Sequence, residues 1–273
     1  LRDLQRQGDE DFPYVYSIES FNRFLKFLSL VPNVDDLSQK LEPMDWQYFI
    51  FAQLFSWFDL DDVPRFSNII ISIARSQGKT MIAGICLNFS YLIEIIGQSN
   101  QDFLVSSLNF DQTMKLFTYV KSMMARIIEN EPFKSLAEET QVQLYSREIK
   151  SLVDANTIHT ISFESGKFDG KHFKLAVADE VGELRTDEGI SKITSGQVNT
   201  EGSRFIEIST SYQTPDVPFH QEQKKLIEIM ERDFDRSGDD QLCLIWSQDN
   251  LEEVFKPETW SKSNPLLNHP KLK

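Results

Sequence analysis

The sequence predicts an α/β fold in which helices flank a mainly parallel sheet. Short apolar runs alternate with amphipathic segments along most of the chain, which is typical of strands and helices that follow one another in a parallel sheet. A loop of small and polar residues at 75–80 joins a buried strand to a helix. The 273 residues, 40% of them hydrophobic, suffice for one large domain with small N-terminal and lid-like helical additions.

Each expected element follows a pattern of apolar residues. Helices repeat these residues every three or four positions, and buried strands run almost continuously apolar. We expect helices over 18–30, 43–58, 78–96, 111–129, 188–197 and 219–234. We expect strands over 66–74, 102–108, 157–163, 173–178, 204–208 and 241–246. Segment 135–152 is polar and mixed, and segment 251–273 lacks a strong pattern.

The loop at 75–80 has the composition of a phosphate-binding loop. Its residues are Arg75, Ser76, Gln77, Gly78, Lys79 and Thr80. The N–H groups at a helix start and the positive end of the helix dipole suit phosphate oxygens. In such loops the lysine, here Lys79, reaches the β- and γ-phosphates, and the following hydroxyl, Thr80, binds Mg²⁺. The usual pattern G-x-x-x-x-G-K-[ST] has glycine where this chain has Ile73, so the loop is a variant.

Residues that follow two further strands are predicted to belong to the same site. The strand at 173–178 is followed by Asp179 and Glu180, the form of a Walker B strand. Asp179 is expected in the Mg²⁺ shell, and Glu180 is expected to orient and deprotonate the attacking water. The strand at 204–208 ends in Ser209, Thr210 and Ser211, whose hydroxyls are suited to sensing the γ-phosphate. Together these features predict a P-loop NTPase of the RecA/ASCE-like kind that binds ATP and Mg²⁺.

The composition of the chain limits which partners, metals and cellular compartments are compatible with it. The net charge of −14 argues against a surface that grips nucleic acid broadly, so DNA contact would need a local basic patch or an assembled channel. The two cysteines fit a reducing compartment, and the four histidines lack metal-ligand spacing. The N-terminus has no signal-peptide pattern, and the longest apolar stretch, 81–96, is too short and polar to span a membrane.

Several motifs together resemble the large terminase subunits of tailed bacteriophages, specifically their N-terminal ATPase module. One is the arginine-bearing loop at 75–80, and another is Trp46-Gln47, ahead of the helix that runs to Trp57. The other motifs are the segment 163–170 shortly before Val177-Ala178-Asp179-Glu180 and the ending Trp260-Ser261-Lys262-Ser263-Asn264-Pro265. The resemblance covers about residues 15 to 270.

The resemblance implies an ATP-driven motor that packages viral double-stranded DNA into a preformed capsid. It implies a homo-oligomeric ring on the capsid portal protein, a small terminase subunit as partner, no membrane, and the cytoplasm of the infected bacterial host as location. We expect an ATPase domain over 1–250, in which the segment 1–60 is helical and includes the adenine-contacting residues. Segment 251–273 is expected to be a linker towards an RNase H-like nuclease domain, for which two dozen residues are too few.

The resemblance also assigns roles to individual residues. Arg75 is implied at the γ-phosphate or in organising the catalytic pocket, with a solvent-facing arginine as the alternative. Gln47 is implied at the adenine edge, with a merely solvated glutamine as the alternative. Residues 209–211 match the family's coupling motif, although their identities depart from its commonest versions. The candidates for a trans-acting charge, each of which is also readable as a plain surface charge, are Arg126, Arg147, Lys167 and Lys171.

Two other functions fit the same motifs. A helicase-type DNA translocase also combines an upstream glutamine, G-K-T, Asp-Glu and Ser-Thr-Ser in this order. A non-hydrolysing, nucleotide-gated module that docks on a capsid portal is the second, although the intact Lys79 and Glu180 argue against an inactive site.

Overall fold

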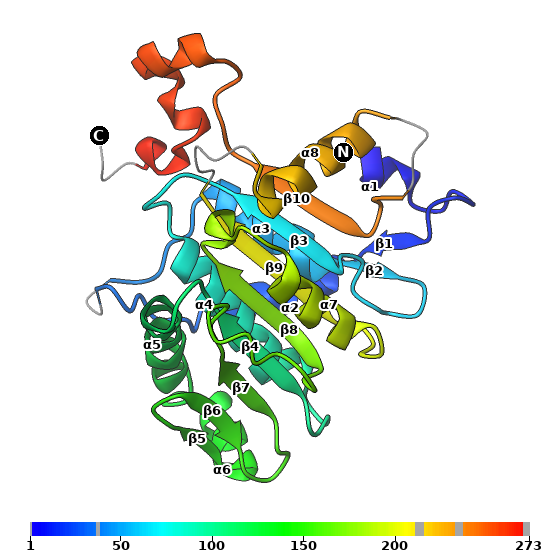
Figure 1. The fold of residues 1–273 in the computed structure, drawn as a ribbon. Helices are drawn as coiled ribbons and strands as arrows, with labels where there is room; N and C mark the ends of the chain where they lie inside the picture. Colours follow the sequence, from blue (N-terminus) through cyan, green and yellow to red (C-terminus); the bar gives the residue numbers. More distant parts are fainter. Residues whose placement is uncertain (1, 37–38, 211–215, 233–236, 270–273) are drawn as a thin grey trace.

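A central sheet organises the computed structural model (Figure 1), which describes residues 2–36, 39–210, 216–232 and 237–269. Among these residues the sheet has eight strands in the order β10-β3-β9-β8-β4-β7-β6-β5. In chain order they are β3 (Asn68–Ser72), β4 (Asp102–Ser106), β5 (Val142–Leu144), β6 (Glu148–Ser151), β7 (Thr157–Thr160), β8 (Phe173–Asp179), β9 (Arg204–Ser209) and β10 (Gln241–Ile245). A separate antiparallel pair consists of β1 (Tyr14–Tyr16) and β2 (Trp57–Asp59).

The six strands from β10 to β7 are parallel, and β6 and β5 continue the sheet antiparallel. Strand β9 lies between β3, which leads into the phosphate loop, and β8, which carries the acidic pair. In register, Ser72 of β3 is level with Ser209, and Asp179 of β8 is level with Ile208. The three strand ends predicted to carry chemistry therefore meet at one edge of the sheet.

The described residues include eight α-helices: α1 (Arg2–Arg6), α2 (Ile18–Leu28), α3 (Asp45–Ser56), α4 (Lys79–Phe89), α5 (Phe110–Ile127), α6 (Phe133–Thr140), α7 (Glu188–Gln197) and α8 (Pro218–Met230). Alternate strand residues face opposite sides of the sheet. Ile69 and Ile71 of β3 join the hydrophobic cluster that includes α2, α3, α4 and α5, whereas Ile70 joins the cluster that includes α7 and α8. Helices thus cover both faces, as expected for a parallel sheet (Figure 1).

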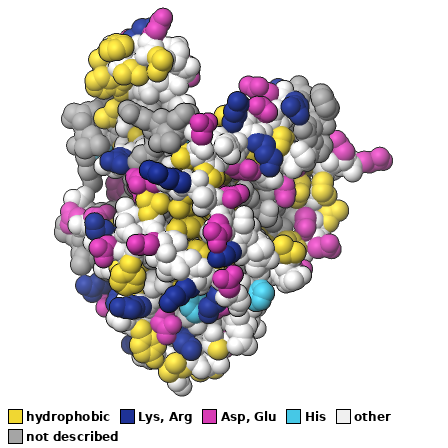
Figure 2. Space-filling model, in the orientation of Figure 1, with side chains coloured by type: hydrophobic (Ala, Val, Ile, Leu, Met, Phe, Trp, Pro, Cys, Tyr) yellow, Lys and Arg dark blue, Asp and Glu magenta, His cyan; other side chains and the backbone are white. Residues whose placement is uncertain are grey.

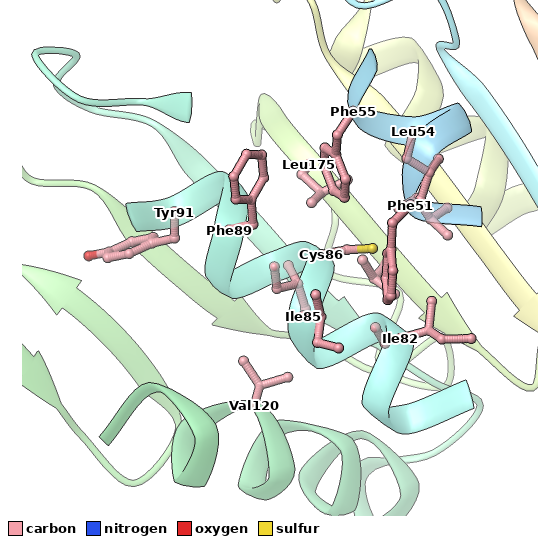
Figure 3. Close-up of a cluster of buried hydrophobic side chains, with 14 of the residues drawn as sticks. Phe51, Leu54, Phe55, Ile82, Ile85, Cys86, Phe89, Tyr91, Val120 and Leu175 are labelled. Carbon is pink, nitrogen blue, oxygen red and sulfur yellow. The ribbon is translucent and has the colours of Figure 1, made fainter. Parts of the chain in front are cut away.

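Aromatic side chains anchor α4 to α3 and α2. The ring of Phe55 stacks on Phe24 with centroids 4.8 Å apart and meets Phe89 edge-on at 4.7 Å. Side chains of α3 and α4 converge in Figure 3, with Leu175 of β8 beside them. Each such ring pair adds about 0.5–1.5 kcal/mol to the burial of its area. The helix that follows the phosphate loop is consequently fixed in the largest region of the core.

Arg204 explains why α4 ends earlier than expected. The chain turns from α4 into a π-helical segment, Ser90–Glu94. Arg204, buried at the start of β9, donates hydrogen bonds to Ser90 and pairs with Glu94. Because the buried guanidinium needs these acceptors, the last predicted turn of the helix follows a wider path.

Other differences from the sequence prediction concern short elements. Segment 135–152 contains the end of α6 and the strands β5 and β6, which have only three and four residues. Elements α1, β1 and β2 were not predicted. The expected helices and strands elsewhere are confirmed, with ends shifted by a few residues. None of the helices in the described ranges is long and apolar enough to cross a membrane.

Beyond β10 the chain forms a small lobe of three 3-10 helices, Leu251–Phe255, Pro257–Lys262 and Pro265–Asn268. Figure 2 shows hydrophobic side chains gathered on this lobe, while acidic and basic side chains are interspersed over the rest of the drawn face. Leu251 and Phe255 are each 86% exposed.

Candidate nucleotide-binding site

The loop from β3 to α4 has the backbone of a phosphate cradle. Gly78 caps the N-terminus of α4 in the left-handed conformation, with φ 79°, and Ser76 also has positive φ. A β-carbon at position 78 would lie 3.2 Å from Gln47 Nε2, so a larger residue meets both strain and crowding. The free N–H groups of the first turn of α4 lie directly after this bend, where an anion is favoured.

Lys79 brings three of the predicted segments together. It is the first residue of α4, and only 8% of it is exposed. Its Nζ donates to Thr210 Oγ1 at 2.9 Å and to the Ala74 carbonyl at 3.4 Å, and it lies 4.0 Å from Glu180 Oε1. A nearly buried ammonium group is therefore held between the phosphate loop, the end of β8 and the end of β9.

The two acids at the end of β8 differ in environment. Burial, reinforced by the charge of Glu180 and opposed by Lys79, raises the pKa of Asp179 to about 6. Glu180 adopts the left-handed conformation, and its N–H donates to Ile208 O and to Asp179 Oδ1, each at 2.9 Å. Because the chain turns at Glu180, its side chain leaves the strand direction that Asp179 follows, which gives the two carboxylates separate positions.

Ser209 connects the phosphate loop with the turn after the acidic pair. Its carbonyl accepts a hydrogen bond from Ile73 N at 3.0 Å, and its Oγ accepts one from Gly182 N at 2.9 Å. Thr210 is joined to Lys79, as described above. Ser211, the third residue of the predicted coupling motif, lies outside the described residues. Ser209 is therefore hydrogen-bonded to the segments on both flanks of β9.

Gln47 lies beneath the phosphate loop. Only 3% of it is exposed, and its Oε1 accepts a hydrogen bond from Met44 N at 2.9 Å at the start of α3. The alternative of a solvated glutamine is thus wrong. Its Nε2 lies beside Gly78, so the amide is next to the loop, while its carbonyl oxygen serves the helix start.

Gln77 has a contact that sequence reasoning missed. Its side chain is buried, donates to Arg75 O at 3.3 Å and accepts a hydrogen bond from Leu266 N at 2.9 Å. Leu266 belongs to the C-terminal lobe, 189 positions away, and no pattern in the sequence pairs the two. The phosphate loop is consequently bonded to the lobe.

The predicted arginines lie in different places. Arg75 is exposed on the loop itself. Arg147 precedes β6, and its guanidinium lies 5.0 Å from the ring centroid of Phe110 at the start of α5, on the sheet edge that carries the site. Arg126 is in the last turn of α5, which returns towards the opposite edge, and it pairs with Glu129 at 3.2 Å. Lys171 also lies at the opposite edge, 3.9 Å from Asp102 at the start of β4.

The metal-binding capacity of the site depends on the nucleotide. No group of three or more histidine, cysteine or acidic side chains with the arrangement of a metal site occurs among the described residues. Mg²⁺ is commonly held by one or two carboxylates together with substrate phosphates and water. Asp179, at the end of β8, and the hydroxyl of Thr80, the second residue of α4, are oxygen ligands of the kind that such a shared site uses.

A phosphate loop before α4, an acidic pair at the end of β8 and a strand between β3 and β8 define a RecA-like P-loop ATPase fold. A family model for the terminase large subunit, ATPase domain, matches residues 45–226. The chain therefore belongs to this family, which confirms the resemblance drawn from its motifs.

Solved structures agree on the fold. The large terminase of bacteriophage HK97 aligns with a TM-score of 0.68 and 20% identity over 91% of this chain and 48% of that chain. A point mutant of the large terminase ATPase domain of Thermus phage P74-26 aligns with a TM-score of 0.59 and 13% identity over 94% of this chain and 96% of that one. The chain thus spans about half the length of the HK97 protein. No curated protein matches it significantly.

Proposed function

We propose that this chain hydrolyses ATP and that hydrolysis drives viral double-stranded DNA into a procapsid. The observation that carries the proposal is the position of the nearly buried Lys79 ammonium, 2.9 Å from Thr210 Oγ1 and 4.0 Å from Glu180 Oε1. The phosphate loop, the carboxylate of the proposed general base Glu180 and the hydroxyl of Thr210 meet at this one charge. Membership of the terminase ATPase family supports the same function.

Each group of residues in the site has a separate proposed role. The N–H groups at the start of α4 and Lys79 would hold the phosphates, and Thr80 and Asp179 would hold Mg²⁺. The metal, when bound, supplies positive charge that offsets the charge developing on the phosphate oxygens. Glu180 would orient a water molecule and accept its proton. Gln47 would lie near the adenine, and Arg75, on the exposed side of the loop, near the γ-phosphate.

Thr210 would report the state of the phosphates. An ammonium group has three donors, and Lys79 already uses two of them, on Ala74 O and Thr210 Oγ1. A phosphate oxygen would take the third donor or displace one of these acceptors. Because Thr210 follows Ser209, which bonds both Ile73 N and Gly182 N, such an exchange would reach both flanks of β9.

The net charge of the chain limits how a single copy could contact DNA. With a net charge of −14, one copy offers no broadly basic surface, so DNA would be held in a channel formed by several copies. We infer a homo-oligomeric ring on a portal protein, with a small terminase subunit as partner, in the cytoplasm of the infected bacterial host. In such a ring Arg147 is better placed than Arg126 and Lys171 to act in trans, since it lies at the edge that carries the site.

The test compares Glu180→Gln with Glu183→Gln, which changes an exposed acid three residues away. We expect Glu180→Gln to retain Mg²⁺-ATP binding and to lose turnover by about 10²–10⁴-fold, while Glu183→Gln resembles the wild type. Protection of DNA from nuclease in the presence of portal-bearing procapsids then measures packaging. Equal turnover in Glu180→Gln and wild type would contradict the assignment. ATP binding without turnover at any protein concentration, DNA included, would favour a nucleotide-gated docking module.

A further inference from the structure

A cavity of about 410 Å³ lies between α7 and α8, on the face of the sheet opposite α4. The residues that line it include Asn68 of β3 and Glu207 of β9, together with side chains from both helices. Phe205 faces the cluster that contains α7 and α8, and Glu207, two positions further along the strand, faces the same way. The cavity is therefore separate from the phosphate loop and was not indicated by any motif.

Glu207 lies at the floor of this cavity, and only 4% of it is exposed. Within the described ranges, no hydrogen bond or ion pair engages its carboxyl group. Burial, followed by the charge of Glu222, raises the pKa of Glu207 to about 8. A buried carboxyl group in the middle of a sheet is costly unless something bonds to it.

Asn68 is a second residue of the cavity lining with an acceptor atom that receives no hydrogen bond from the described part of the chain. Its Oδ1 is buried and has no hydrogen-bond partner among the described residues. Asn68 Oδ1 and the Glu207 carboxylate are both acceptors, and both residues line the cavity. What the cavity lacks is a group that only donates hydrogen bonds.

The walls favour a cation that carries a short apolar chain. Ile190, Pro218 and Phe219 provide apolar surface. Asp187 and Glu222 add negative charge, and the one lysine of the lining, Lys225, pairs with Glu222 at 3.5 Å. The lining thus carries three acidic side chains and one lysine, a composition that favours a positive group over an anion.

We propose that the cavity between α7 and α8 binds an aliphatic ammonium group, whose N–H donors satisfy Glu207 while its methylene chain packs on Ile190 and Phe219. The same chemistry is offered by a small free amine and by the side chain of a lysine. No covalent step is involved. The ammonium binds the carboxylate form of Glu207, so a proton passes from that carboxyl group to solvent whenever it was protonated beforehand.

Release of a proton from Glu207 on binding would distinguish this site from a cavity that binds ligands through apolar packing alone. The other titratable groups that line the cavity are Asp187, just before α7, and Glu222 and Lys225 of α8. The proton released on binding is that of the Glu207 carboxyl group. Below the pKa of Glu207, affinity should rise by about tenfold for each pH unit and level off above it.

The experiment is calorimetric titration of the full chain with n-butylammonium, with Nα-acetyl-lysine amide, and with neutral n-butanol. The variants are Glu207→Gln and, as a matched control, Glu228→Gln, which alters an exposed acid of α8, the helix that borders the cavity. We expect saturable binding of n-butylammonium, proton uptake by the buffer, a loss of at least about tenfold in Glu207→Gln, and wild-type behaviour in Glu228→Gln. Thermal unfolding verifies that each variant is folded.

The two amine probes separate the sources. Binding of both supports a site for a lysine side chain, and binding of n-butylammonium alone supports a site for a small free amine. The proposal is overturned if neither amine binds saturably, if n-butanol binds equally well, or if Glu207→Gln binds the amine as tightly as the wild type. If affinity does not change with pH below the pKa of Glu207, the role of its carboxylate is likewise refuted.

Discussion

Replacing Glu207 by glutamine should change how the stability of the protein depends on pH. The pKa of this carboxyl group is 4.5 in its ordinary state and about 8 in the folded chain. Since the folded state binds the proton more tightly than the unfolded state, the native protein loses stability as pH rises from 4.5 towards 8. Below that window the group is protonated in both states and contributes no pH dependence.

The size of the effect follows from the shift. One pKa unit corresponds to about 1.4 kcal/mol, so between about pH 6 and about pH 7.5 the wild type should lose roughly 2 kcal/mol relative to the variant. Glutamine has a similar shape and cannot ionise, so Glu207→Gln removes this slope. The variant should consequently unfold at a higher urea concentration than the wild type at the upper pH, and the gap should narrow at the lower pH.

The assay is urea unfolding followed by circular dichroism at several pH values in a buffer free of amines. Glu228→Gln on the exposed side of α8 provides the comparison for a loss of charge without burial. Parallel stability profiles of wild type and Glu207→Gln across the window would show that Glu207 titrates as an ordinary acid. The account of the cavity floor would then be wrong.

Three further substitutions test the nucleotide site and its connections. Lys79→Ala should weaken binding of a fluorescent ATP analogue by at least about tenfold, because it removes the charge at the centre of the site; unchanged affinity would contradict this role. Ser209→Ala leaves the buried N–H of Gly182 without its acceptor and should lower the unfolding free energy by about 1–3 kcal/mol, measured in urea; an unchanged midpoint would refute the bridging role. Gln77→Ala removes the acceptor of Leu266 N, so amide hydrogen exchange at Leu266 should become faster while that in α4 stays slow; equal exchange at Leu266 would show that the bond is dispensable.

Local patterns carried the prediction of the fold and of the nucleotide site. The phosphate loop and the acidic pair each lie within a few residues of a strand end, and parallel strands bring such ends to one edge. Lys79, Thr210 and Glu180 could therefore be expected together, and the structure places them within reach of one another.

Interactions between segments far apart in the chain could not be predicted from the sequence. The bond between Gln77 and Leu266 depends on the path of the lobe, and the pairing of Arg204 with Glu94 depends on a π-helical turn that no periodicity marks. Strands β5 and β6 are too short for an alternating pattern to stand out. The cavity at Glu207 arises from the spacing of α7 and α8, which periodicity along one strand does not describe.

The hydrogen bond from Leu266 N to Gln77 Oε1 links the orientation of the C-terminal lobe to the conformation of the phosphate loop. A backbone rearrangement at Gln77 during nucleotide exchange must either break this bond or carry the lobe along with it. Leu251 and Phe255, each 86% exposed on the lobe, would then turn with it. The exposed apolar side chains of the lobe would thereby change position together with the loop at 75–80.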